Sequence, residues 1–324
     1  MVKPDFAVSV VVPCYNEQES IEALYRRATD AIKAVVGESY ELILVNDGSK
    51  DQTWSLIDSL VERDSHVVGI NLSRNFGHQM AVTAVLSFAR GPRVMIIDAD
   101  LQDPPELLGP MMAAMDEGAD VVYGQRAARA GETWFKKTTA SLFYRILQSL
   151  SDVDIPRDVG DFRLMNRKTV DAILSMPEQS RFLRGMVSWV GYHQVALLYD
   201  RHERVAGVTK YPLRKMLIFA RDAIIGFSLR PIRVTIHIAL IVMALALLLL
   251  FYVAVGWLAG NAVQGWTSLL GSLLLLSGVQ LFCLGIVGEY VAHIFLEVKR
   301  RPLFLIRQIR RQDETVSVPS ETQV

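Results

Sequence analysis

The sequence has very little cysteine and no excess of either charge. Only 2 of its 324 residues are cysteine, and one of them, Cys283, lies deep in an apolar region, so no disulfide framework is expected. Lys and Arg together number 34, as do Asp and Glu. This balance gives no indication of a nucleic-acid partner, and we expect none. No signal peptide precedes the first apolar run, so we expect the N-terminal domain to stay where it is synthesised.

Charge is missing altogether from one long stretch. Between Arg233 and Glu289 there is no Asp, Glu, Lys or Arg. Two apolar runs in this stretch, at 234–256 and about 269–288, are long enough to cross a bilayer as helices, and we expect the spans at about 234–256 and 268–290. Uncharged runs of this length are rare in soluble proteins. The sequence therefore predicts a transmembrane hairpin at 233–295.

Basic residues flank this hairpin at both ends but are missing from its loop. Arg230 and Arg233 precede it, and a basic tail at 296–324 follows it. By the positive-inside rule, both termini and the globular domain should lie on the cytoplasmic side of the plasma membrane. Residues 211–232 carry apolar side chains at three- and four-residue steps among basic ones, which predicts an interfacial amphipathic helix. A similar pattern at 133–150 fits an ordinary core-facing helix equally well.

We expect residues 1–210 to form the globular domain, and its first 125 residues alternate between strand and helix patterns. Short β-branched runs predict strands at 8–12, 41–45, 67–72, 94–97 and 120–123, and helical patterns fill the intervals at 17–36, 52–62, 77–89 and 105–117. Such alternation predicts a mainly parallel sheet with helices on both faces. In sheets of this class, ligands bind beyond the carboxyl ends of the strands.

Acidic turns stand at these strand ends. Asp47 follows the second expected strand, and Asp98 and Asp100 follow the fourth. Two carboxylates that flank one residue can bind Mg²⁺ or Mn²⁺, which also take phosphate oxygens from a substrate. There is no Gly-x-x-x-x-Gly-Lys-Ser/Thr and no Gly-x-Gly-x-x-Gly motif, which argues against P-loop hydrolysis and dinucleotide oxidoreduction.

Taken together, the motifs resemble those of the family 2 glycosyltransferases with the GT-A fold, and especially the polyprenyl-phosphate glycosyltransferases. The matching segments are 12–17, 46–49, 73–77, 98–104, 160–163 and 288–290. The resemblance implies a Rossmann-like GT-A domain, a nucleotide-sugar donor, Mg²⁺ or Mn²⁺, and inverting transfer to polyprenyl (undecaprenyl) phosphate. Processive relatives carry a Gln-x-x-Arg-Trp signature. Because this chain has no Arg-Trp pair, we expect transfer of a single sugar.

The resemblance also implies roles for individual residues. It implies that Pro13, Tyr15, Glu17 and Asp47 line the nucleotide pocket, with Asp47 contacting the base. Asp98 would bind ribose or phosphate, Asp100 the metal, and Gln102 the metal or the sugar. Arg126 would lie near the acceptor phosphate, and Arg204 and Lys210 would belong to a loop that closes over the phosphates. The resemblance implies that Asp161 is the catalytic base or a positioning residue. Alternatively, Asp161 is a loop carboxylate that only orients Arg163 or caps a turn. His78 is interpreted as a packing or capping residue at a helix start.

The motifs constrain the identity of the sugar and the oligomeric state less than they constrain the family. Segments 159–165 and 188–191 look most like the bactoprenol glucosyltransferases, which implies UDP-glucose; mannose, N-acetylglucosamine and amino-arabinose donors are the alternatives. A non-catalytic scaffold in a membrane polysaccharide complex is a different class of function, against which the intact acidic turn argues. Gly271, Gly278 and Gly285 form one stripe that would admit either the first span or another subunit. With the family resemblance, this stripe implies a homo-oligomer such as a tetramer.

Overall fold

The computed structural model describes residues 6–126, 159–200, 230–258, 265–312 and 314–316. The chain divides into two units, an α/β unit that includes the C-terminal residues from Arg301 onward and a second unit that includes Arg214–Arg300. The expected amphipathic helix at 211–232 falls almost entirely outside the described residues, and the similar segment at 133–150 falls wholly outside them.

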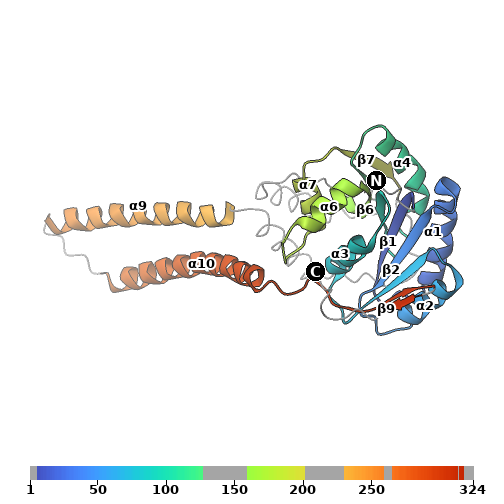
Figure 1. Ribbon diagram of the computed structural model, residues 1–324. Coiled ribbons are helices and arrows are strands. Elements are labelled where there is room, and N and C mark those ends of the chain that lie inside the picture. The colour runs from blue at the N-terminus through green and yellow to red at the C-terminus, as the bar shows by residue number, and fades with distance from the viewer. Residues whose placement is uncertain (1–5, 127–158, 201–229, 259–264, 313, 317–324) are drawn as a thin grey trace. The chain divides into compact units, whose positions relative to one another are not determined.

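One mixed sheet forms the centre of the α/β unit (Figure 1). In the described part of the chain its strands are β1 (Val8–Cys14), β2 (Tyr40–Asn46), β3 (Val67–Leu72), β4 (Arg93–Ile96), β5 (Val121–Arg126), β6 (Val159–Asn166), β7 (Gln194–Tyr199), β8 (Ile306–Arg311) and β9 (Glu314–Val316). Their order is β7-β5-β6-β4-β1-β2-β3-β8-β9. The central strands β4, β1, β2 and β3 are parallel, whereas β6 and β8 pair antiparallel with their neighbours.

Helices cover both faces of the sheet, as the sequence predicted (Figure 1). On one face lie α1 (Ile21–Val36), α2 (Thr53–Arg63), η1 (Pro105–Leu107) and α4 (Leu108–Asp116); on the other lie α3 (His78–Phe88), α6 (Arg167–Ser175) and α7 (Leu183–Trp189). Every residue of β1, β2 and β3 is buried, because these strands are covered on both faces, and most of their side chains are accordingly apolar. These strands are the ones that the sequence predicts most directly.

The C-terminal segment differs from the expected basic tail at 296–324. After the hairpin the chain forms β8, which pairs with β3 at the edge of the sheet, and then β9. Leu305 O accepts a hydrogen bond from Ser73 N at 2.8 Å, and Arg307 Nη2 donates to Ser73 O at 3.0 Å. Arg307, Arg310 and Arg311 therefore belong to a strand, and its partner strand β3 lies more than two hundred residues earlier in the chain.

Arg310 attaches this strand to α2, and its replacement should weaken that attachment. Its Nε lies 2.5 Å from Asp58 Oδ1 and its Nη2 lies 3.3 Å from Glu62 Oε1. Arg310→Glu would place like charges together and should destabilise the α/β unit by about 1 kcal/mol, which corresponds to a Tm lower by about 2–4 °C. Thermal unfolding of the full chain in detergent measures this. Arg311→Glu, the next residue of β8, is the matched control, and an equal Tm for the two variants would contradict the prediction.

The hairpin unit contains two long apolar helices, α9 (Arg230–Leu258) and α10 (Trp266–Lys299), which contact each other (Figure 1). Ile232–Leu249 and Leu275–Lys299 are long and apolar enough to cross a membrane. Large apolar side chains such as those of Leu248, Phe251 and Leu281 are exposed along both helices. Exposed apolar surface of this extent is typical of contact with lipid or with another protein.

Candidate functional site

The loop after β1 is held to the loop after β2 by side-chain hydrogen bonds. Ser49 Oγ accepts from Asn16 N at 2.9 Å, and Asn16 Oδ1 accepts from Lys50 N at 3.0 Å. Asn16 adopts a positive φ of 54°, which its short polar side chain tolerates. The β1 loop also carries the residues expected in the nucleotide pocket. Of these, Pro13 is buried, Glu17 is half-buried and Tyr15 is exposed.

Asp47, which follows β2, holds the segment that leads into α3. Its carboxylate accepts hydrogen bonds from Phe76 N at 2.7 Å and from Gly77 N and Asn75 Nδ2, both at 3.0 Å. The residue is only 3% exposed, and burial raises its pKa although the hydrogen bonds from Phe76 and Gly77 oppose the shift. Both oxygens thus have protein partners, and the expected contact with the base would have to use their remaining lone pairs.

The acidic turn after β4 brings together Asp98, Asp100 and Gln102. Asp100 Oδ1 accepts from Gln102 N at 3.2 Å, and Leu101 between them has a positive φ of 59°. In the part of the chain that the structure describes, no three His, Cys, Asp or Glu side chains are grouped so that they alone could hold a metal. Asp100 and Gln102 offer only oxygen ligands. They therefore fit an ion such as Mg²⁺, which takes few protein ligands and completes its shell with water and substrate phosphate.

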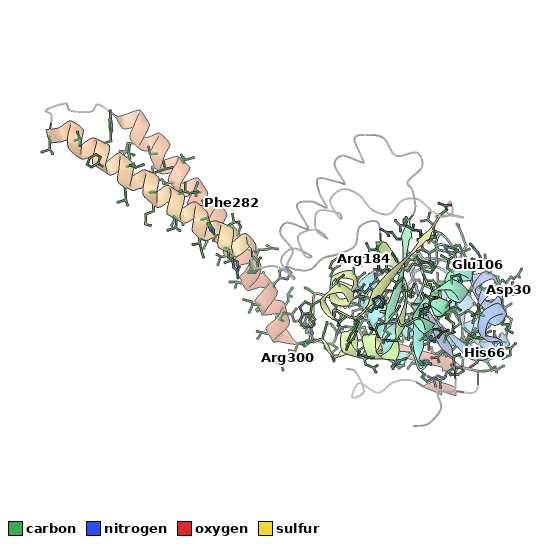
Figure 2. All side chains as sticks on the ribbon, turned by 90° about the horizontal axis from the view of Figure 1, so that it is seen from above. Asp30, His66, Glu106, Arg184, Phe282 and Arg300 are labelled. Carbon is green, nitrogen blue, oxygen red and sulfur yellow. The ribbon has the colours of Figure 1, made fainter. Side chains whose placement is uncertain are left out.

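Asp161 lies in β6, and three side chains from α3 and α7 donate to its carboxylate. Oδ1 accepts from Arg184 Nε at 2.9 Å; Oδ2 accepts from His78 Nε2 at 3.0 Å, Gln79 Nε2 at 3.3 Å and Arg184 Nη2 at 3.4 Å. His78 Nε2 also lies 3.8 Å from Asp98 Oδ1. The cluster therefore connects β6 with the acidic turn after β4. Figure 2 labels Arg184 in the α/β unit.

The ionisable side chains of this cluster shift one another's pKa values. Burial alone would raise the pKa of Asp161, but Arg184 and the hydrogen bond from His78 hold it well below its usual range. Burial opposes a charge on His78, yet its hydrogen bond to Asp161 and the nearby Asp98 raise its pKa to about 9. Burial raises the pKa of Asp98 to about 6, with His78 opposing the shift and Asp161 adding to it. Both shifts favour the charged forms, a carboxylate at Asp161 and an imidazolium at His78.

Arg126, at the end of β5, belongs to a second group of polar side chains. It hydrogen-bonds Tyr199, whose hydroxyl donates to Asp103 Oδ1 in the acidic turn. A Cβ on Gly160 would lie 3.4 Å from Arg126 Nη2, so the guanidinium also lies against the start of β6. Arg126 is thus connected to both the β4 turn and β6. Arg204 and Lys210 fall in 201–229, outside the described residues.

The sequence did not identify three of the side chains that surround Asp161. His78 was interpreted as a packing or capping residue, and Gln79 and Arg184 were not singled out. A signal for His78 existed, because it directly follows the matched segment 73–77 at a strand end. No comparable signal existed for Arg184. Arg163 Nη2 donates to Gly160 O at 2.9 Å, and Asp161 acts on the Arg163 guanidinium through its charge, so the alternative in which Asp161 orients Arg163 stays a prediction.

Known proteins resemble the chain over nearly its whole length. Residues 9–174 match the family described as Glycosyl transferase family 2, and residues 230–294 match the GtrB C-terminal hairpin. The uncharacterized glycosyltransferase YkcC of Bacillus subtilis is 44% identical over 93% of this chain and 93% of its own length. The SfII prophage-derived bactoprenol glucosyl transferase of Shigella flexneri is 39% identical over 94% and 98%, and the prophage bactoprenol glucosyl transferase homolog of Escherichia coli K12 is 37% identical over 94% and 99%.

Proposed function

The chain belongs to glycosyl transferase family 2 and is a glycosyltransferase, and we propose that it transfers one glucose from UDP-glucose to polyprenyl phosphate, such as undecaprenyl phosphate. One observation carries the proposal. The similarity to bactoprenol glucosyl transferases covers 94% of this chain and therefore includes both the α/β unit and the hairpin. A catalytic domain and a membrane hairpin in one chain suit a soluble donor and a lipid acceptor.

We assign the donor to the loops after β1, β2 and β4. Pro13, Tyr15, Glu17 and Asp47 would surround the nucleotide, Asp98 would contact ribose or phosphate, and Asp100 and Gln102 would hold Mg²⁺ or Mn²⁺. Such an ion, when bound, stabilises the negative charge of the departing diphosphate. Hydrogen bonds support the assignment, because they join the β1 and β2 loops to each other and Asp47 to the segment before α3, and so hold these strand ends in one arrangement before the donor binds.

The acceptor brings its own nucleophile. A phosphate monoester carries about 1.5 to 2 negative charges near pH 7, so its oxygen can attack the anomeric carbon without losing a proton to the protein. The new bond joins that oxygen to the anomeric carbon, and the bond from the carbon to the diphosphate breaks. In-line attack inverts the configuration and gives a β-linked lipid sugar from an α-linked donor. We therefore assign Asp161 to positioning rather than to proton removal, and Arg126, Arg204 and Lys210 to the phosphates.

The two apolar helices of the hairpin support association of the protein with a membrane. We propose that α9 and α10 span the plasma membrane, that both termini and the α/β unit are cytoplasmic, and that the chains form a homo-oligomer such as a tetramer. The basic residues at both ends of the hairpin and the uncharged loop between the helices support this orientation. The acceptor phosphate would then be reached at the cytoplasmic leaflet.

A product assay tests the function. Purified full-length protein is incubated with undecaprenyl phosphate and, separately, UDP-glucose, UDP-N-acetylglucosamine, GDP-mannose or a UDP-linked amino-arabinose, with and without Mn²⁺. We expect a lipid product heavier by one hexose with UDP-glucose, and at least tenfold less without the ion because the diphosphate then leaves uncompensated. Mass spectrometry of the lipid measures it. Release of free sugar only, without a sugar lipid, would contradict the lipid acceptor.

A further inference from the structure

The cluster around Asp161 has its anion buried and its cations partly exposed. The Asp161 side chain is 5% exposed, whereas that of His78 is 34% exposed and that of Arg184 is 29% exposed. His78 binds the carboxylate through Nε2 at 3.0 Å, and Arg184 binds it through its Nε–Nη2 edge, at 2.9 Å and 3.4 Å. The carboxylate therefore fixes two positive groups that both reach solvent.

A contribution to folding stability does not by itself explain why this position carries a buried ion-pair cluster. Removing a carboxylate from water is unfavourable, and buried ion pairs are often no more stabilising than apolar side chains of the same volume. An apolar side chain can occupy the same face of β6, because buried Met165 lies four residues beyond Asp161 in the strand. What the charged arrangement adds is orientation, because hydrogen bonds from α3 and α7 converge on one group.

The position of the cluster indicates what the two cations face. In the antiparallel register Ile96 of β4 pairs with Arg163 of β6, so the residues that follow β4 run alongside the beginning of β6. His78 Nε2 is accordingly 3.8 Å from Asp98 Oδ1. A phosphate brought to this acidic turn would be repelled by Asp98 unless cations lay beside it. His78 and Arg184 are cations held at that place, and an Arg guanidinium suits phosphate through its planar fork.

We propose that His78 and Arg184 together bind a phosphate group of a substrate, and that Asp161 is the positioning carboxylate that holds both. The inference rests on the proposed function. It deepens that function by assigning a phosphate-binding role to two residues that the motifs do not identify. The phosphate belongs either to the acceptor monoester or to the donor diphosphate, and the experiment separates these sources.

His78→Gln and Arg184→Gln in the full-length protein test the pair. Each removes a positive charge while retaining a side chain that can donate to Asp161. For every variant we would measure the Kd of UDP with Mn²⁺ by calorimetry, and the KM for undecaprenyl phosphate together with kcat. Each variant should weaken one of the two binding constants by about tenfold or more, since a hydrogen bond to a charged group is lost.

Matched controls exist elsewhere in the α/β unit. His66 Nδ1 lies 2.9 Å from Asp64 Oδ1, so His66→Gln removes a histidine paired with a carboxylate in the same way. In Figure 2, His66 lies on the opposite side of the α/β unit from Arg184. Arg93→Gln likewise removes an arginine paired with Asp116. Both controls should leave the two constants within twofold of wild type.

The outcomes are distinct. A raised KM for undecaprenyl phosphate with unchanged UDP affinity assigns the acceptor phosphate, and weaker UDP binding assigns the donor diphosphate. Both constants within twofold of wild type overturn the proposal, even if kcat falls. If Arg184→Gln fails to fold, Arg184→Lys, which keeps the charge but loses the planar guanidinium, must still weaken one of the two constants by about threefold or more, and unchanged constants would overturn the proposal. A wild-type protein that makes no lipid product contradicts the proposed function instead.

Discussion

Replacing Asp100 with alanine should abolish most of the transfer activity while the protein remains folded. Asp100 lies in the acidic turn after β4 and provides, with Gln102, the oxygen ligands that fit Mg²⁺ or Mn²⁺. A metal at a departing diphosphate is worth several kcal/mol, so its loss should lower kcat by about 100- to 1000-fold. Lipid product formed per minute at saturating substrates measures the change.

Two further measurements show whether the metal is the cause. Asp100→Ala should no longer bind UDP more tightly when Mn²⁺ is added, whereas wild type should. Asp171→Ala, which removes an exposed carboxylate of α6, is the matched control and should keep the wild-type rate. An Asp100→Ala protein that transfers sugar at the wild-type rate would remove Asp100 from the metal site.

Gly48→Ala should have the largest effect on stability among simple substitutions near the site. Gly48 follows Asp47 and has a φ of +63°, and a Cβ there would lie 2.4 Å from both Arg74 C and Asn75 N. The strained backbone and the overpacking together should destabilise the α/β unit by about 2–5 kcal/mol, because main-chain atoms of the neighbouring loop must shift. The same shift should weaken UDP binding, since that loop also donates to Asp47.

Gly191→Ala is the control that separates backbone strain from overpacking. Gly191 has a similar φ of +69°, but a Cβ there would come no closer than 4.0 Å to its nearest neighbour, Trp189 O. Only the strain of about 1–2 kcal/mol should remain. Thermal unfolding of both variants tests this, and equal losses of Tm would show that the approach of Gly48 to Arg74 and Asn75 is not limiting.

The parallel centre of the sheet could be predicted because its pattern is local. β1, β2 and β3 are continuous buried runs, and each is followed within a few residues by the start of a helix. The outer strands could not be predicted in this way. β6 contains buried Asp161 and Arg163 in place of an apolar alternation, and β8 is a basic segment whose pairing partner β3 lies far away in the sequence.

Part of the candidate site could likewise be predicted from the sequence, and part could not. The turns at 46–49 and 98–104 could be identified because strand ends of a parallel sheet converge on one edge. The partners of Asp161 could not, since His78, Gln79 and Arg184 come from two helices whose separation in the sequence carries no periodic signal. Asp47 was predicted at the nucleotide, and only its hydrogen bonds reveal that it also holds the start of α3.

By itself, the sequence determined the class of fold, the family, the apolar hairpin and the acidic turns, because each depends on residues that are adjacent or regularly spaced along the chain. Only the tertiary structure decided which charges are paired. It placed the buried carboxylate of Asp161 between His78 and Arg184, and it placed the basic C-terminal segment in the sheet beside β3. Ion pairs and edge strands are formed by residues that meet through folding, and their distances in space do not follow from their distances in sequence.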